Sequence, residues 1–107
     1  MMDQRTKAQF ELRAKIIKAM AHPTRLFIVD QLSRQERCVC ELVDMIGADT
    51  STVSKHLTVL KNAGIAKDEK RGAMVYYTLR CPCVMSFLEC VTSVVEQNAR
   101  EHLHLVA

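Results

Sequence analysis

Residues 50–64, with the sequence TSTVSKHLTVLKNAG, constrain the fold of this chain more than any other stretch. Val53, Leu57 and Leu60 recur at the spacing of one helical face, which predicts a helix with an apolar back. Asp49 precedes the segment as a candidate N-cap residue. Gly64 follows it, where helices favour a left-handed residue. The segment therefore predicts a short helix that packs on a core through one stripe.

The other face of this helix is polar. We expect it to present Ser51, Thr52, Ser54, Lys55, His56 and Lys61. Hydroxyls and lysines hold phosphates, and polar side-chain tips reach base edges, so such a face suits the major groove of DNA. The alternative is an ordinary surface helix, and the neighbouring segments decide between the two interpretations.

The segments on either side predict a winged helix-turn-helix. Residues 38–47 form a short apolar-faced helix that ends at Gly47, so residues 38–63 predict helix, tight turn and second helix. Residues 65–79 then change to a strand pattern with a charged, glycine-containing turn, which predicts a hairpin. A hairpin directly after a helix-turn-helix is a wing, and its tip, Lys70 and Arg71, is expected to meet phosphates or a minor groove.

Two flanking helices complete the predicted fold. Residues 4–20 place Phe10, Ala14 and Ile17 on one face, and residues 23–35 predict a helix buried through Leu26, Val29 and Leu32. Residues 82–103 keep an apolar spacing over five turns. So long a stripe predicts packing on the same helix of a second copy, although packing within one domain is the alternative.

These segments together predict the fold class. We expect one domain over residues 1–107 that is mainly α with a small β-hairpin. Its architecture is a winged helix-turn-helix, and it forms a homodimer through terminal helices at 4–20 and 82–103.

Charge and composition narrow the function. The net charge is only +3, but residues 50–72 carry five cations against two carboxylates and the rest of the chain sums to zero. This concentration favours a phosphate-contacting surface, although a solvated surface can show it by chance. With no apolar run that spans a membrane and a polar N-terminus, we expect a cytoplasmic protein. No catalytic motif is visible, so we expect no enzyme.

The five cysteines do not predict a disulfide scaffold, because their number is odd and the expected compartment is reducing. Four of them form two Cys-x-Cys pairs, Cys38 with Cys40 and Cys81 with Cys83. Such pairs favour two thiolates on one soft metal or metalloid over a mutual disulfide. Unrelated packed thiols are the alternative.

Three motifs carry a resemblance to a known family: AMAHPTR at 19–25, RCVCEL at 37–42, and STVSKHL at 51–57 with LKNAGI at 60–65. With them, residues 10–100 resemble the ArsR/SmtB family of metal-sensing winged-helix repressors, most closely its arsenic-responsive members. The resemblance implies a homodimer bound to double-stranded operator DNA. It also implies that a toxic metal or metalloid releases the protein and that resistance genes are then transcribed.

The chain departs from the family at its metal box. Arsenic-sensing relatives often have a third cysteine where this chain has Val43, and cadmium-sensing relatives add cysteines from an N-terminal arm, whereas no cysteine here precedes Cys38. In winged helices the segment before the helix-turn-helix often pairs with the returning wing strand. This topology predicts that one or both of Cys81 and Cys83 join Cys38 and Cys40.

The set of cysteines leaves several inducers open. Three sulfurs suit arsenite or antimonite, our first expectation, and four suit cadmium or zinc; lead and copper(I) also remain. Cys90 is expected to be a packed thiol, although it could be a ligand across the dimer. His102 and His104 are expected to be solvated rather than zinc ligands.

Two further hypotheses remain. One gives the repressor a different inducing signal, and the other places the chain in a different class of protein. The first is a thiol redox or persulfide switch, with a disulfide from Cys38 or Cys40 to Cys81, Cys83 or Cys90. The second is a soft-metal sequestering protein without a DNA role, against which the basic stretch from Lys55 to Arg71 argues.

Overall fold

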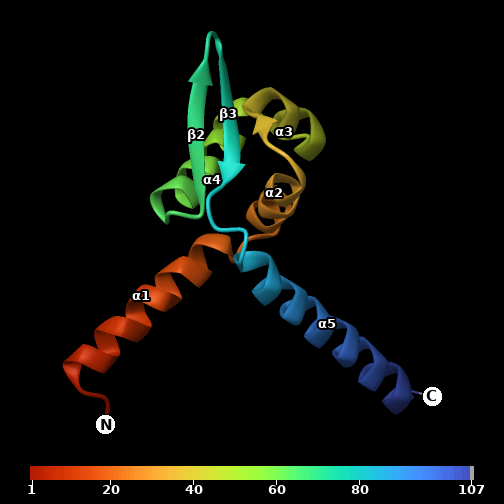
Figure 1. The fold of residues 1–107 in the computed structure, drawn as a ribbon. Helices are drawn as coiled ribbons and strands as arrows, with labels where there is room; N and C mark the ends of the chain where they lie inside the picture. Colours follow the sequence, from red (N-terminus) through yellow and green to blue (C-terminus); the bar gives the residue numbers. More distant parts are fainter. Residues whose placement is uncertain (107) are drawn as a thin grey trace.

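The computed structural model describes the backbone of residues 1–106 and the side chains of residues 1–103, so the side chain of His104 lies outside it. In chain order the elements are α1 (Gln4–Met20), α2 (Pro23–Arg34), β1 (Arg37–Cys38), α3 (Val39–Ile46), α4 (Thr50–Asn62), β2 (Ala66–Arg71), β3 (Met74–Leu79) and α5 (Val84–Val106). Helices α2, α3 and α4 and the sheet gather into one body. The terminal helices α1 and α5 extend from that body in diverging directions, on the side opposite the tip of the β2–β3 hairpin (Figure 1).

The predicted fold class is confirmed: the chain is mainly helical, with a winged helix-turn-helix built from α3, α4 and the hairpin. Gly47 ends α3 with a φ of 78°, a left-handed conformation that lets the chain turn at once toward α4. The Asp49 carboxylate then accepts a hydrogen bond of 2.8 Å from the backbone N–H of Thr52 and so caps α4.

The sheet has three antiparallel strands in the order β1-β3-β2. The short strand β1 lies beside β3, with Arg37 opposite Tyr77 and Cys38 opposite Tyr76. Gly72 turns the hairpin with a φ of 61°. The register of β1 fixes where the first cysteine pair sits along the wing.

The core lies between α2, α3, α4 and the base of the wing. As predicted, Val53, Leu57 and Leu60 are fully buried. The expectation for α2 is wrong at Leu26, which is 39% exposed, and Ile28 is buried in its place. The buried face of α2 is the one that meets α4 and β3, whereas Leu26 faces the side where α5 leaves the domain.

The terminal helices contact the core only near the ends that join it. On the predicted apolar face of α1, Phe10 is 52% exposed and Ile17 47% exposed, and burial begins at Ala19. That face therefore has no core to pack on within one chain. Over the described part of the chain, no helix has the length and apolarity that a membrane span requires.

We predict that Leu57→Ala lowers the free energy of unfolding by about 2–5 kcal/mol, because it leaves a cavity in a fully packed site. Val59→Ala, on the exposed side of the same helix, is the matched control and is expected to change it by no more than about 0.5 kcal/mol. Urea unfolding at one fixed protein concentration measures both variants. Equal losses would show that α4 does not pack through this stripe.

Candidate nucleic-acid interface and cysteine site

The first turns of α4 present the predicted polar face. Ser51, Thr52 and Lys55 are exposed, while Ser54 is half-buried. Asp49 anchors this end of the helix, and the hydrogen bonds that it accepts from Thr52 and Ser51 lower the pKa of its carboxyl group. The helix therefore begins at a fixed point with hydroxyls and one cation directed outward.

Two of the predicted phosphate-binding cations are paired within the chain. Lys61 Nζ lies 3.0 Å from Asp68 Oδ2, a hydrogen bond that raises the pKa of the lysine. Arg71 donates to both Glu36 oxygens at 2.8 and 2.9 Å and to Glu69 at 3.0 Å, and its guanidinium lies over the Tyr76 ring. These bonds raise the pKa of Arg71 above its ordinary value.

This pairing changes the predicted roles on the wing. Arg71 ties the wing to the loop before β1, and no local pattern in the sequence identified Glu36 as its partner. Lys55 and Lys70 are exposed, and neither forms an ion pair with any side chain that the structure describes. Of the predicted cations, these two remain available to a phosphate, Lys55 on α4 and Lys70 on the wing.

His56 does not lie on the outward face where we expected it. It is half-buried, because it lies three residues after Val53 and so shares the inward side of α4. Its ring packs against His22, with centroids 4.4 Å apart, and its Nδ1 lies 3.3 Å from Arg25 Nη1. The spacing of His56 from Val53 and Leu60 was the sequence signal that could have identified this position.

Cys38 and Cys40 lie at the junction of β1 and α3. Cys38 is 2% exposed and Cys40 is exposed. The two residues form a disulfide, with a Cα–Cα distance of 5.4 Å, where we expected two free thiolates. Cys38 is the extended N-cap residue of α3 and Cys40 lies in its first turn, so the bend between strand and helix brings the two sulfurs together.

The junction is held by a second set of contacts. The backbone N–H of Cys38 donates to Glu41 Oε1 at 3.1 Å, while Arg37 reaches Glu41 Oε2 at 3.5 Å and Gln31 Oε1 at 3.1 Å. Glu41 is thereby engaged with the backbone and with Arg37. The arrangement links any change at the cysteines to the start of α3 and to α2.

The structure does not bring Cys81 and Cys83 to the first pair within one chain. Cys38 lies opposite Tyr76, and β3 continues to Leu79, about 10 Å further at ~3.3 Å per residue, before the chain reaches Cys81. Cys81 Sγ lies 3.6 Å from the Gly64 carbonyl oxygen instead. Among the described side chains, no group of three or more potential metal ligands comes together. The strand pairing was expected, but its register separates the cysteines.

A hollow of about 330 Å³ adjoins the first cysteine pair. Its walls come from the cysteine junction, the start of α4 and the wing, and they are Cys38, Val39, Cys40, Thr50, Ser54, Ala73, Met74 and Val75. A group bound at these cysteines would therefore lie beside two elements of the candidate DNA interface.

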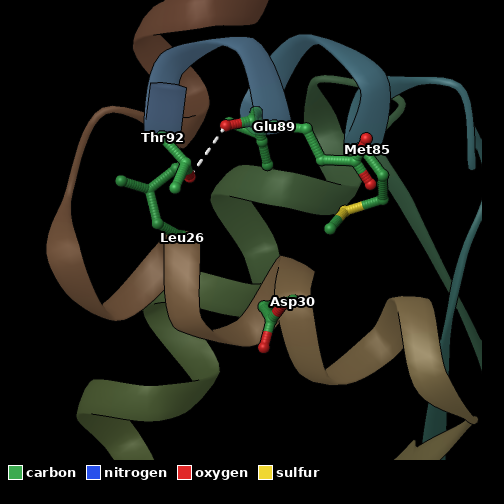
Figure 2. A pocket seen from close by; sticks show the side chains of 6 residues that line it. Leu26, Asp30, Met85, Glu89 and Thr92 are labelled. Atoms are coloured by element: carbon green, nitrogen blue, oxygen red, sulfur yellow. Dashed lines mark hydrogen bonds between the residues drawn. The ribbon is translucent and has the colours of Figure 1, made fainter. Parts of the chain in front are cut away.

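A second hollow, of about 320 Å³, lies between α2 and α5 (Figure 2). Leu26 and Asp30 of α2 face Met85, Glu89 and Thr92 of α5 across it, and Thr92 donates a hydrogen bond to the Leu88 carbonyl. Its polar lining is two carboxylates and a hydroxyl, with no thiol. The exposed Cys90 is not part of it. The chemistry of this hollow does not suit a thiophilic ion.

Comparison with known proteins assigns the family. A family model described as "Bacterial regulatory protein, arsR family" matches residues 22–68, from the start of α2 into the wing. A transcriptional repressor SmtB homolog of Synechocystis is 32% identical over 90 residues, which are 84% of this chain and 68% of that protein. The chain belongs to the ArsR/SmtB family. This is a family of transcriptional regulators rather than enzymes.

Two further ArsR/SmtB relatives define how far the likeness extends. A cadmium resistance transcriptional regulatory protein CadC homolog of Staphylococcus aureus is 48% identical over 67 residues, 62% of this chain. The matched part spans 55% of that protein's length. The homodimeric winged helix-turn-helix DNA-binding domain of Mb0332 from Mycobacterium bovis superposes with a TM-score of 0.78 at 27% identity. That match covers 94% of this chain and 93% of the other.

We predict that Lys70→Ala reduces the salt dependence of binding to operator DNA. The slope of log K against log salt is expected to fall by about one for each phosphate that the lysine no longer neutralises. Lys67→Ala, on the exposed surface of the same strand, is the control for general loss of charge. Titrations at several salt concentrations give the slopes. Identical slopes for the wild type and Lys70→Ala would show that the wing tip does not contact DNA phosphates.

Proposed function

We propose that this ArsR/SmtB protein is a homodimeric repressor that binds double-stranded operator DNA through α4 and the wing. In this proposal a thiophilic metal or metalloid ion, held by Cys38 and Cys40, lowers the affinity for DNA and permits transcription. The single observation that carries the proposal is the position of the cysteine pair, which adjoins both the start of α4 and the wing.

The exposed apolar faces of the terminal helices support the dimer. Phe10 and Ile17 of α1 and Phe87, Val91 and Val94 of α5 are exposed, although each lies on an apolar stripe. Exposed stripes of this kind are rare on a monomer and mark an interface. A second copy supplies a matching surface by symmetry, and the related domain of Mb0332 is described as homodimeric.

The ion is soft, because the donors are thiolates. Arsenite and antimonite, which take three sulfurs, are our first candidates, and cadmium or zinc is the alternative. The name of the staphylococcal relative favours cadmium. One chain offers two adjacent sulfurs, so either kind of ion needs further ligands. The pairing of two chains would have to supply them, either from Cys81, Cys83 or Cys90 or from the first cysteine pair of the second chain.

We predict that the reduced protein binds its promoter DNA. Arsenite is expected to lower its affinity for that DNA by about 5–150-fold, the usual range of such coupling. Cys38→Ser is expected to bind DNA as the wild type does and to lose the response. Fluorescence anisotropy measures both, with cadmium titrated separately. Release by cadmium alone would replace arsenite as the inducer, and full release of Cys38→Ser by either ion would place the site elsewhere.

The remaining cysteines are tested one at a time. Cys81→Ser, Cys83→Ser and Cys90→Ser are matched variants of equal size and polarity, and the one that loses the response supplies the missing sulfur. If all three respond normally, Cys38 and Cys40 of the two chains are sufficient.

The Cys38–Cys40 disulfide favours a second candidate function, a thiol redox switch. It uses a different bond from the one that we predicted, because the structure places Cys81 far from Cys38. In metal-free buffer, oxidant is then expected to change the DNA affinity of the wild type and of Cys81→Ser but not of Cys38→Ser. An unchanged affinity in the wild type would exclude the switch.

A further inference from the structure

Arg25 connects the end of α1 to the body of the domain. Its Nε donates to the Ala19 carbonyl at 2.7 Å, and its Nη2 lies 3.5 Å from the Lys18 carbonyl. The last carbonyls of a helix have no partner within the helix, and a cation near them is favourable. Arg25 thus caps the helix whose apolar face is the proposed dimer surface.

The same guanidinium reaches α4. Arg25 Nη1 lies 3.3 Å from His56 Nδ1, and the His56 ring packs against His22. His22 is itself fixed, because its Nδ1 accepts a hydrogen bond of 3.1 Å from the backbone N–H of Thr24 and caps α2. Three helices therefore meet at one cluster, His22, Arg25 and His56.

The cluster requires a neutral His56. Arg25 is always a cation and can only donate, so the Nδ1 of His56 must accept, with its proton on Nε2. Among the described residues, the charged groups that act on His56 are His22 and Arg25. The contribution of α1 is the pair of backbone carbonyls, of Lys18 and Ala19, that accept from Arg25. Burial, followed by the charges of His22 and Arg25, lowers the pKa of His56 below its ordinary value of 6.5.

We infer that Arg25 and His56 are positioning residues that hold the DNA-reading helix α4 at a fixed place relative to α1, so that acidification weakens DNA binding. This inference rests on the DNA binding proposed above. A proton on His56 removes the acceptor of Arg25 and places a second cation beside the first. The hydrogen bond then breaks, and α4 is freed from the end of the dimer helix.

The sign of the effect separates this role from direct contact. If His56 touched a phosphate, its protonation would add an attraction and acid would tighten DNA binding. The pKa of His56 is lowered while its ring is buried beside His22 and Arg25. Protonation of His56 therefore favours the state in which its hydrogen bond to Arg25 is broken. Folding stability and DNA affinity are therefore both expected to fall as the pH drops below 6.5.

The test is DNA binding by the reduced protein at about pH 7.5 and about pH 5.5, with ionic strength held constant. We expect a loss of affinity of at most about tenfold, because pH 5.5 lies only about one unit below the ordinary pKa of 6.5. His56→Asn places an amide oxygen near the Nδ1 position and cannot titrate, so its affinity is expected to change less with pH. His102→Asn, on exposed α5, is the matched control and is expected to retain the wild-type dependence.

His22→Asn separates the two roles of its residue. Asparagine retains a side-chain oxygen that can cap α2, while the ring that packs against His56 is removed. We expect this variant to fold and to show a smaller pH dependence. Unchanged or tighter binding of the wild type at low pH would overturn the inference, as would a full pH dependence in His56→Asn.

A measurement without DNA keeps this inference separate from the proposed function. Absence of DNA binding at neutral pH would refute the repressor proposal, whereas an NMR titration of the free protein still reports the pKa of His56. Arg25→Gln removes the cation and is expected to raise that pKa toward 6.5, while Arg25→Lys, which keeps the charge, is expected to keep it low. Equal pKa values in all three proteins would refute the link.

Discussion

Burial of the apolar stripe of α4 is the interaction on which the rest of the structure depends. Val53, Leu57 and Leu60 fill the space between α2, α3 and the base of the wing, and no part of these side chains reaches solvent. Because a helix has one rotation about its axis once this face is buried, the same packing decides which side chains point outward. The hydroxyls and Lys55 of the candidate DNA interface are outside because the stripe is inside.

Around this core, electrostatics divides the cations into two groups. Lys61 and Arg71 are held by carboxylates of the hairpin and of the loop before β1, and they stiffen the wing. Lys55 and Lys70 are exposed, and neither forms an ion pair with a described side chain. The cluster around Arg25 has a different role, since it joins the end of α1 to α4.

The register between β1 and β3 decides whether the two cysteine pairs lie close together. The two Cys-x-Cys pairs were visible in the sequence, and so was the pairing of the segment before α3 with the returning strand. Whether they meet depends on which residues are opposite one another, and Cys38 opposite Tyr76 leaves Cys81 beyond the far end of β3. The first pair also closes on itself, which places both its redox chemistry and its proposed ion binding at the junction of β1 and α3.

The sequence by itself determined the winged helix-turn-helix, because helical and strand periodicities, caps and glycine positions act over a few residues and are written locally. It also determined the family, through three short motifs. Only the tertiary structure decided that Glu36 holds Arg71, that Leu26 is exposed, and that the two cysteine pairs lie apart. Each of these depends on contacts between residues distant in the chain, whose geometry follows from helix packing and strand register rather than from any local pattern.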